Sequence, residues 1–129
     1  MRLEHIAIWV DDIEQMRSFY EVYFDAKAGP QYTNSENVFT SHFLTFDSGT
    51  RLEIMHRPKV SARSGNGAAE KLGYAHLAIS VGSEAAVDAL IECLKADGYE
   101  VLDGPRRTGD GYYEGVVLDP EANRIEITV

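Results

Sequence analysis

Two histidines and two glutamates recur in the same order in the two halves of the chain. His5 precedes Glu53 by 48 positions, and His76 precedes Glu126 by 50 positions. Each lies in a short stretch of alternating residues, on the side opposite the aliphatic row. Imidazole and carboxylate groups without a thiolate suit nickel, cobalt, zinc, manganese or iron. If two sheets face each other, the four side chains converge, and we predict one divalent metal ion between them.

An amphipathic helix is expected after each histidine-bearing strand. In the first half, Asp11-Asp12-Ile13-Glu14 is typical of a capping box, and apolar residues at three- and four-residue spacing predict a helix that ends before Gly29. In the second half, Ser83 is the expected N-cap and Gly98 the expected end. Cys93 falls among apolar residues of this second helix, so we expect a buried, unreactive thiol.

Short strands complete each half, and the predicted fold class is α+β. Two tandem β-α-β-β-β modules are expected at about 1–57 and 74–129, within a single domain that spans 1–129. A linker rich in Gly and Ser is expected at 58–73. Its neighbourhood contains Arg57, Lys59 and Arg63, which we interpret as solvated, although they could reach a substrate carboxylate or phosphate. The strands are expected at 3–10, 37–46, 50–55, 74–81, 99–102, 112–118 and 124–129.

Composition and charge argue against several function classes. With 129 residues, of which 44% are hydrophobic and 26% charged, the chain has the make-up of one ordinary globular domain. A net charge of −9 argues against nonspecific binding to nucleic acid or to an anionic membrane, since both require a basic face. The first residues contain no signal-peptide pattern, so a cytoplasmic location is expected.

A resemblance to a known family lies in three segments: Leu3–Asp12, Gly73–Val81 and Leu118–Ile127. They resemble the vicinal oxygen chelate superfamily, which includes glyoxalase I, extradiol dioxygenases, fosfomycin-resistance transferases and bleomycin-binding proteins. In that family, paired modules form a cupped mixed sheet around a divalent metal. The order His, Glu, His, Glu is similar to that of bacterial glyoxalase I. The resemblance implies that the chain forms a homodimer, and that its metal ligands are His5, Glu53, His76 and Glu126.

The resemblance also implies an activity, that of a glyoxalase-like lyase or isomerase related to lactoylglutathione lyase. Adjacent oxygens of a small substrate would chelate the ion, and a glutamate would remove a proton from the carbon beside a carbonyl to give an enediolate. The catalytic base would be Glu126 or Glu53, and the resemblance favours Glu126. The residues expected to line the substrate pocket are Trp9, Phe43, Met55 and Tyr113.

Two other functions are left open. An extradiol-type iron dioxygenase of this family uses two histidines and one glutamate, so the presence of Glu53 argues against it. A binding protein that sequesters an aromatic drug generally lacks the ligand set. Glutathione-using members carry an arginine near the position of Trp9, so the sequence does not establish whether a thiol is used. His42 and His56 have no counterparts in the second half and are interpreted as incidental, although His42 could line the pocket.

Overall fold

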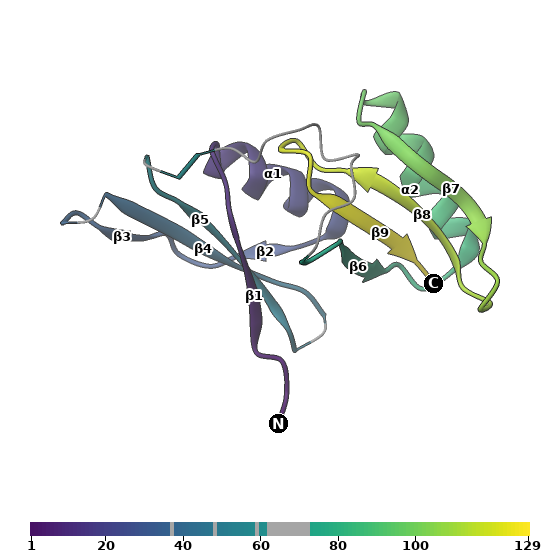
Figure 1. Cartoon of the computed structure of the whole chain (residues 1–129), viewed down its shortest axis with the longest axis horizontal. Coiled ribbons are helices and arrows are strands. Elements are labelled where there is room, and N and C mark those ends of the chain that lie inside the picture. The colour runs from purple at the N-terminus through teal and green to yellow at the C-terminus, as the bar shows by residue number, and fades with distance from the viewer. Residues whose placement is uncertain (37, 48, 59, 62–72) are drawn as a thin grey trace. The chain divides into compact units, whose positions relative to one another are not determined.

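The computed structural model describes residues 1–36, 38–47, 49–58, 60–61 and 73–129 (Figure 1). The chain divides into two compact units, Met1–Arg63 and Ser64–Val129, and each is described here by itself. Most of the predicted linker at 58–73, including Lys59 and Arg63, lies outside the described residues. None of the described helices is both long and apolar enough to cross a membrane.

The first unit is a mixed sheet with one helix. Its sheet has the strand order β1-β5-β4-β2, and β3 also pairs with β4. Strands β1 and β5 are parallel, whereas the other pairs are antiparallel. Its elements are β1 (His5–Trp9), α1 (Ile13–Phe24), β2 (Lys27–Ala28), β3 (Tyr32–Asn34), β4 (Phe39–Thr45) and β5 (Arg51–His56).

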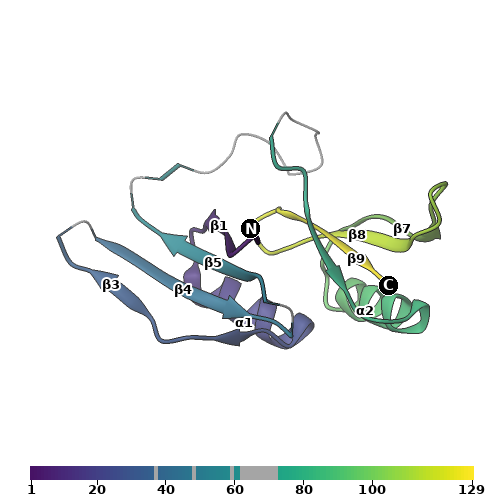
Figure 2. The ribbon, with the colours of Figure 1, turned by 90° about the horizontal axis from the view of Figure 1, so that it is seen from below.

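The second unit repeats this plan. Its sheet has the order β6-β9-β8-β7, in which the first strand is again parallel to the last and the other pairs are antiparallel. The helix packs on strands β7, β8 and β9 (Figure 2). The predicted α+β fold with two β-α-β-β-β-like modules is therefore confirmed, as two mixed sheets. The elements are β6 (Leu77–Ser80), α2 (Glu84–Ala96), β7 (Val101–Arg107), β8 (Tyr113–Leu118) and β9 (Arg124–Thr128).

Both helices begin at the predicted caps. The Asp12 carboxylate accepts hydrogen bonds from the backbone N–H groups of Glu14 and Gln15, at 3.1 and 2.9 Å, and the Ser83 hydroxyl accepts one from Ala86 at 3.2 Å. These side chains satisfy N–H groups that have no partner within the helix. Within the predicted capping segment, Asp12 rather than Asp11 is the N-cap.

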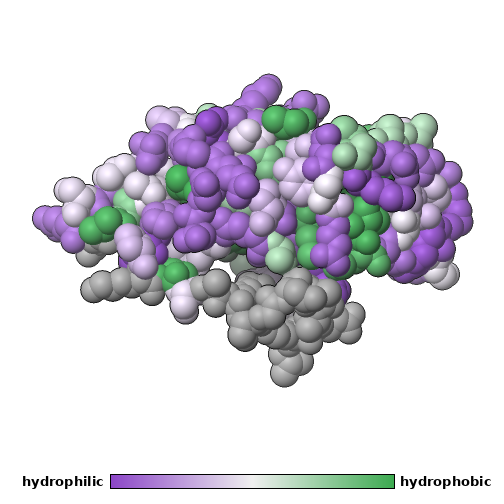
Figure 3. Space-filling view, turned by 90° about the horizontal axis from the view of Figure 1, so that it is seen from above, coloured by the Kyte–Doolittle hydropathy of each residue, from purple (hydrophilic) through white to green (hydrophobic). Residues whose placement is uncertain are grey.

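Each helix buries one apolar stripe against its own sheet. Fully buried side chains include Met16 and Tyr20 of α1 and Ile91 of α2. On the sheets they meet alternate residues such as Ile54 and Ile125, which are also fully buried. Hydrophilic residues cover much of the face drawn in Figure 3. Because each helix covers one face of its sheet, the other face is left for polar and half-buried side chains.

The first helix ends at Phe24, before Gly29 as predicted, because Asp25 adopts a left-handed conformation with φ 51°. Other sequence predictions are wrong in detail. Cys93 is exposed rather than buried. It is one position from buried Leu94, and one residue turns the side chain about 100° around a helix, away from the sheet. Strand β7 continues to Arg107 instead of ending at Leu102, and the short strands β2 and β3 were not predicted.

Candidate functional site

Strand pairing brings His5 and Glu53 together in the first unit. The parallel register of β1 and β5 pairs His5 with Arg51 and Ala7 with Glu53, so all four residues lie on one face. The Nε2 atom of His5 is 3.9 Å from Oε2 of Glu53. The alternate residues of β5 point to the opposite face and are buried under α1. This side of the sheet therefore presents one imidazole and one carboxylate within reach of a common ligand.

A neighbouring carboxylate fixes the orientation of the first histidine. Glu4 contacts Nδ1 of His5 and also forms an ion pair with Arg51. The hydrogen bond with His5, opposed by desolvation and assisted by Arg51, lowers the pKa of Glu4. An imidazole that donates its Nδ1 hydrogen to a carboxylate keeps the Nε2 lone pair free for a metal. The sequence analysis did not identify Glu4 as a partner of His5. Its position next to His5 in the chain was the only indication of this contact.

The second unit repeats the pair with slightly different placement. His76 immediately precedes β6, which begins at Leu77 and not at Tyr74 as expected. The parallel register pairs Ala78 with Glu126 of β9, so His76, two residues before Ala78, is on the side of Glu126. The Nε2 atom of His76 is 3.4 Å from Oε2 of Glu126. Both predicted His–Glu pairs are thus brought together, each within its own unit.

A second carboxylate accompanies Glu126. Glu114 of β8 pairs with Thr128, and Val116 pairs with Glu126, so the two glutamates are diagonal neighbours on one face of the sheet. Burial, followed by the negative charge of Glu126, raises the pKa of Glu114, and a side-chain hydrogen bond with Glu126 adds to the effect. Sequence reasoning missed Glu114 because its neighbour comes from the next strand.

Three of the four predicted pocket residues share a face with His5 and Glu53. Trp9 pairs with Met55, and Phe43 pairs with Glu53. The ring of Phe43 meets the imidazole of His5 edge to face, with centroids 5.4 Å apart. These residues give the first unit an aromatic and thioether lining beside its His–Glu pair.

The fourth predicted pocket residue, Tyr113, lies on the other side of its sheet. Its hydroxyl donates a 2.7 Å hydrogen bond to Asp88 of α2, so its side chain is on the helix-covered face, opposite Glu114 and Glu126. This hydrogen bond and the charge of Asp88 raise the pKa of Tyr113. We therefore leave Tyr113 out of the site.

The remaining two histidines, His42 and His56, contact backbone carbonyl oxygens. Nδ1 of His42 is 2.9 Å from the carbonyl oxygen of Gly29, and Nδ1 of His56 is 3.0 Å from that of Val10. His42 pairs with Ile54 and is buried on the helix side of the first sheet. Both histidines lie on the face opposite Glu53, where they have no access to His5.

The donor chemistry of the two pairs fits a divalent transition metal. Two neutral imidazoles and two carboxylates are ligands for zinc, nickel, cobalt, manganese or iron, and the carboxylate on Nδ1 of His5 is the supporting contact that such histidines usually have. Within the described part of the chain, no three His, Cys, Asp or Glu side chains gather closely enough to hold an ion together. Each unit presents two such donors, one imidazole and one carboxylate.

Comparison with known proteins agrees with the fold. The family model described as Glyoxalase/Bleomycin resistance protein/Dioxygenase superfamily matches residues 2–127. A search of curated proteins found no match. One similar structure is a glyoxalase family protein from Enterococcus faecalis, at 22% identity and TM-score 0.78, with 99% of this chain and 97% of that chain covered.

Two further similar structures are of proteins with a stated activity, and one of them contains a bound metal and ligand. The trypanothione-dependent glyoxalase I of Leishmania major is 22% identical, with TM-score 0.76 and coverage of 99% of this chain and 86% of that one. A mutant of the fosfomycin resistance protein FosX from Listeria monocytogenes is 23% identical, with TM-score 0.72 and coverage of 98% and 90%. That structure contains Mn(II) and 1S,2S-dihydroxypropylphosphonic acid. At these identities the likeness shows the fold.

Proposed function

We propose that this chain, which belongs to the Glyoxalase/Bleomycin resistance protein/Dioxygenase superfamily, is a divalent-metal-dependent, glyoxalase-like lyase or isomerase acting on a small oxygenated substrate. The observation that carries the proposal is the repeated His–Glu pair. Each unit sets one imidazole 3.4–3.9 Å from one carboxylate, on the sheet face that its helix does not cover.

The residues that would hold the ion are His5, Glu53, His76 and Glu126, two from each unit of the 1–129 domain. A bound divalent ion would supply Lewis-acid stabilisation of the negative charge that develops on adjacent substrate oxygens. Glu4 would keep Nε2 of His5 available for the ion through its contact with Nδ1. The structure containing Mn(II) and a vicinal diol among the similar proteins supports this choice of cofactor and substrate chemistry.

We assign the proton transfer to Glu126. A carboxylate base removes the proton from the substrate carbon next to the carbonyl and returns it to the adjacent carbon, a form of assistance worth roughly 10²–10⁴-fold. Glu114 lies beside Glu126, and burial together with the charge of Glu126 raises the pKa of Glu114. Glu53 is the alternative base, and its neighbours are the imidazole of His5 and, across the strand pair, Phe43.

We further propose that the chain works in the cytoplasm as a homodimer on a small molecule, without nucleic acid or membrane as a partner. In a dimer with shared sites, the pair from one chain would complete its site with the other pair from the partner. Trp9, Phe43 and Met55 would line the pocket beside the His5 half of the site.

The metal proposal is tested by purifying the protein without chelator and measuring bound transition metal. We expect about one divalent ion per chain, because four protein ligands make one site. His76→Ala should lose the ion, while His56→Ala should keep it, since His56 lies on the face opposite Glu53 and its Nδ1 contacts the Val10 carbonyl. Retention of full metal by His76→Ala would contradict the ligand assignment.

The activity is tested with a hemithioacetal and a catechol as substrates. Turnover of the hemithioacetal supports the lyase, whereas ring opening of the catechol with iron would support an extradiol dioxygenase instead. Glu126→Gln should retain at least part of the metal, since the amide oxygen is a weak ligand, but lose proton abstraction. Glu92→Gln, on the exposed side of α2, is the matched control. Metal-free protein that binds a planar drug at micromolar concentration would favour the binding-protein alternative.

A further inference from the structure

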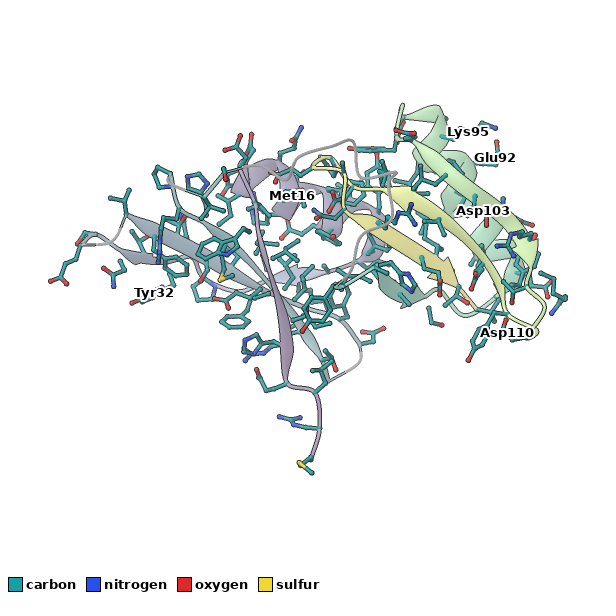
Figure 4. All side chains as sticks on the ribbon, in the orientation of Figure 1. Met16, Tyr32, Glu92, Lys95, Asp103 and Asp110 are labelled. Carbon is teal, nitrogen blue, oxygen red and sulfur yellow. The ribbon has the colours of Figure 1, made fainter. Side chains whose placement is uncertain are left out.

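Arg57 directly follows β5 and lies against two aromatic rings. Its guanidinium carbon is 5.4 Å from the centroid of the Trp9 ring and 5.8 Å from that of Phe39. The two rings themselves meet edge to face at 6.1 Å. Tyr32 of β3 stands next to Phe39, with ring centroids also 6.1 Å apart, and its position at the outer edge of the first sheet is visible in Figure 4. The guanidinium is therefore held by an aromatic platform.

In the part of the chain that the structure describes, Arg57 lacks the carboxylate partner that four other arginines have. Arg17, Arg51, Arg106 and Arg107 each form an ion pair with a glutamate or aspartate. Arg57 is exposed, and no carboxylate of the described residues forms an ion pair with it. In a chain of net charge −9, a cation that faces rings and not carboxylates is available to an external anion.

The strand pattern places Arg57 on the face of the proposed metal site. Glu53, Met55 and Arg57 are alternate residues, so they project to one side, with Trp9 opposite Met55. Ser41 pairs with Met55, and one further step of that register sets Phe39 opposite Arg57. Four residues of strand separate Glu53 from Arg57 by about 13 Å along the backbone. A molecule that reaches from one to the other would cross the apolar surface of Trp9 and Met55.

We propose that Arg57, Trp9 and Phe39 form an anion-binding subsite for a carboxylate or phosphate at the far end of the substrate. This inference rests on the proposed function, because the other end of the substrate would bring its adjacent oxygens to the metal. The guanidinium offers several N–H donors to the anion, while the rings limit its motion and reduce the entropy lost on binding. Trp9 is 41% exposed, so its ring can contact the part of the substrate that connects the metal-binding end to the anionic end.

The test uses two hydroxamic acids that differ at one end. In both, a hydroxamate supplies the metal-chelating oxygens and a chain of about six methylene groups spans the distance along β5. One ends in a carboxylate, and the other in the uncharged primary amide. Binding to the zinc-loaded protein is measured by calorimetry and by emission of Trp9, which is the single tryptophan of the chain and lies in the subsite.

We expect the carboxylate compound to bind wild-type protein about fivefold more tightly than the amide, which is the range of one partly exposed ion pair. Arg57→Gln should abolish this preference and leave binding of the amide unchanged. Arg51→Gln is the matched control: Arg51 also lies over a ring, 4.0 Å from the centroid of Phe43, but it is neutralised by Glu4, so the preference should persist.

The two proposals fail in different ways. Equal affinity of wild-type protein for both compounds, or a preference that survives in Arg57→Gln, would overturn the anion subsite and leave the metal site standing. Failure of both compounds to bind the metal-treated protein would contradict the proposed metal site, and the subsite with it. Repeating the titration with the phosphate-ended analogue ranks the two anions. A preference for either one that requires Arg57 supports the inference.

Discussion

Replacing Gly115 by alanine should destabilise the second unit more than the same replacement at an open glycine position. Gly115 lies on β8 and faces α2, where a Cβ would come closer than 3.0 Å to Cδ1 of Ile91 and within 3.1 Å of the carbonyl oxygen of Asp103. Carbon atoms pack at about 3.5–4.0 Å, so Ile91 or the helix must move. Gly115 also pairs with Ile127 of β9, the strand that carries Glu126. Gly115→Ala therefore perturbs both the core and the support of the site.

The magnitude follows from two opposing effects. Adding a methyl group to a packed core costs about 1–3 kcal/mol, and here Ile91 is 1% exposed, which leaves its side chain little space to yield. Replacing glycine by alanine also reduces the freedom of the unfolded chain, which stabilises the fold by about 0.4–1 kcal/mol where the backbone is compatible. We expect a net loss of about 1–2 kcal/mol, or roughly 4–7 °C in Tm for a domain of this size.

The assay is urea unfolding followed by circular dichroism, with two companion variants. At Gly109 no atom lies within 4 Å of an added Cβ, so Gly109→Ala should change the free energy of unfolding by less than about 0.5 kcal/mol. Ile91→Val removes the Cδ1 atom that the methyl group introduced by Gly115→Ala would meet, so the double variant should be more stable than the sum of the single effects by at least about 0.5 kcal/mol. Gly115→Ala with the stability of Gly109→Ala, or strict additivity with Ile91→Val, would refute the packing argument.

Three further predictions concern the site. Glu4→Gln should weaken metal binding about 10- to 100-fold in competition with a chromogenic chelator, because His5 loses the carboxylate that orients it; unchanged affinity would contradict that role. The folded state binds the Glu114 proton more tightly than the unfolded chain does, so its stabilising effect is lost as pH rises through the raised pKa. In metal-free protein Glu114→Gln should therefore raise Tm at pH 7, with the gain shrinking below about pH 4.5, and equal gains at both pH values would argue against it. If dimers share their sites, subunit exchange between His5→Ala and His76→Ala chains should restore about a quarter of all metal sites when half the dimers are mixed, and confirmed exchange without rescue would place each site within one chain.

The parts of the fold that the sequence predicts correctly depend on local patterns. Alternation along 5–9 and 124–128 places His5 and Glu126 on faces that the structure confirms as opposite the aliphatic rows, and Asp12 and Ser83 cap the helices with their own side chains. The parts that sequence reasoning missed depend on contacts between distant residues. Strand β2 has only two residues and exists through its pairing with β4. The sequence also does not show that Asp88, 25 residues earlier, accepts a hydrogen bond from the Tyr113 hydroxyl and holds this side chain on the helix-covered face.

The two modules share a fold, but the residues around their two His–Glu pairs differ. This difference supports different roles for the two pairs in the proposed reaction. His5 has a carboxylate on Nδ1, a ring beside it and an arginine near that carboxylate, which suits a fixed metal ligand. Glu126 has instead a second, partly buried carboxyl beside it, Glu114, whose pKa its charge helps to raise. A group that must exchange protons gains from a neighbour that can hold one, whereas a group that must stay bound to metal gains from rigid support. Repetition of the fold thus places one His–Glu pair in each unit, while the residues around the pairs do not repeat. Under the proposed function, this difference suits the first pair to holding the ion and Glu126 of the second pair to moving the proton.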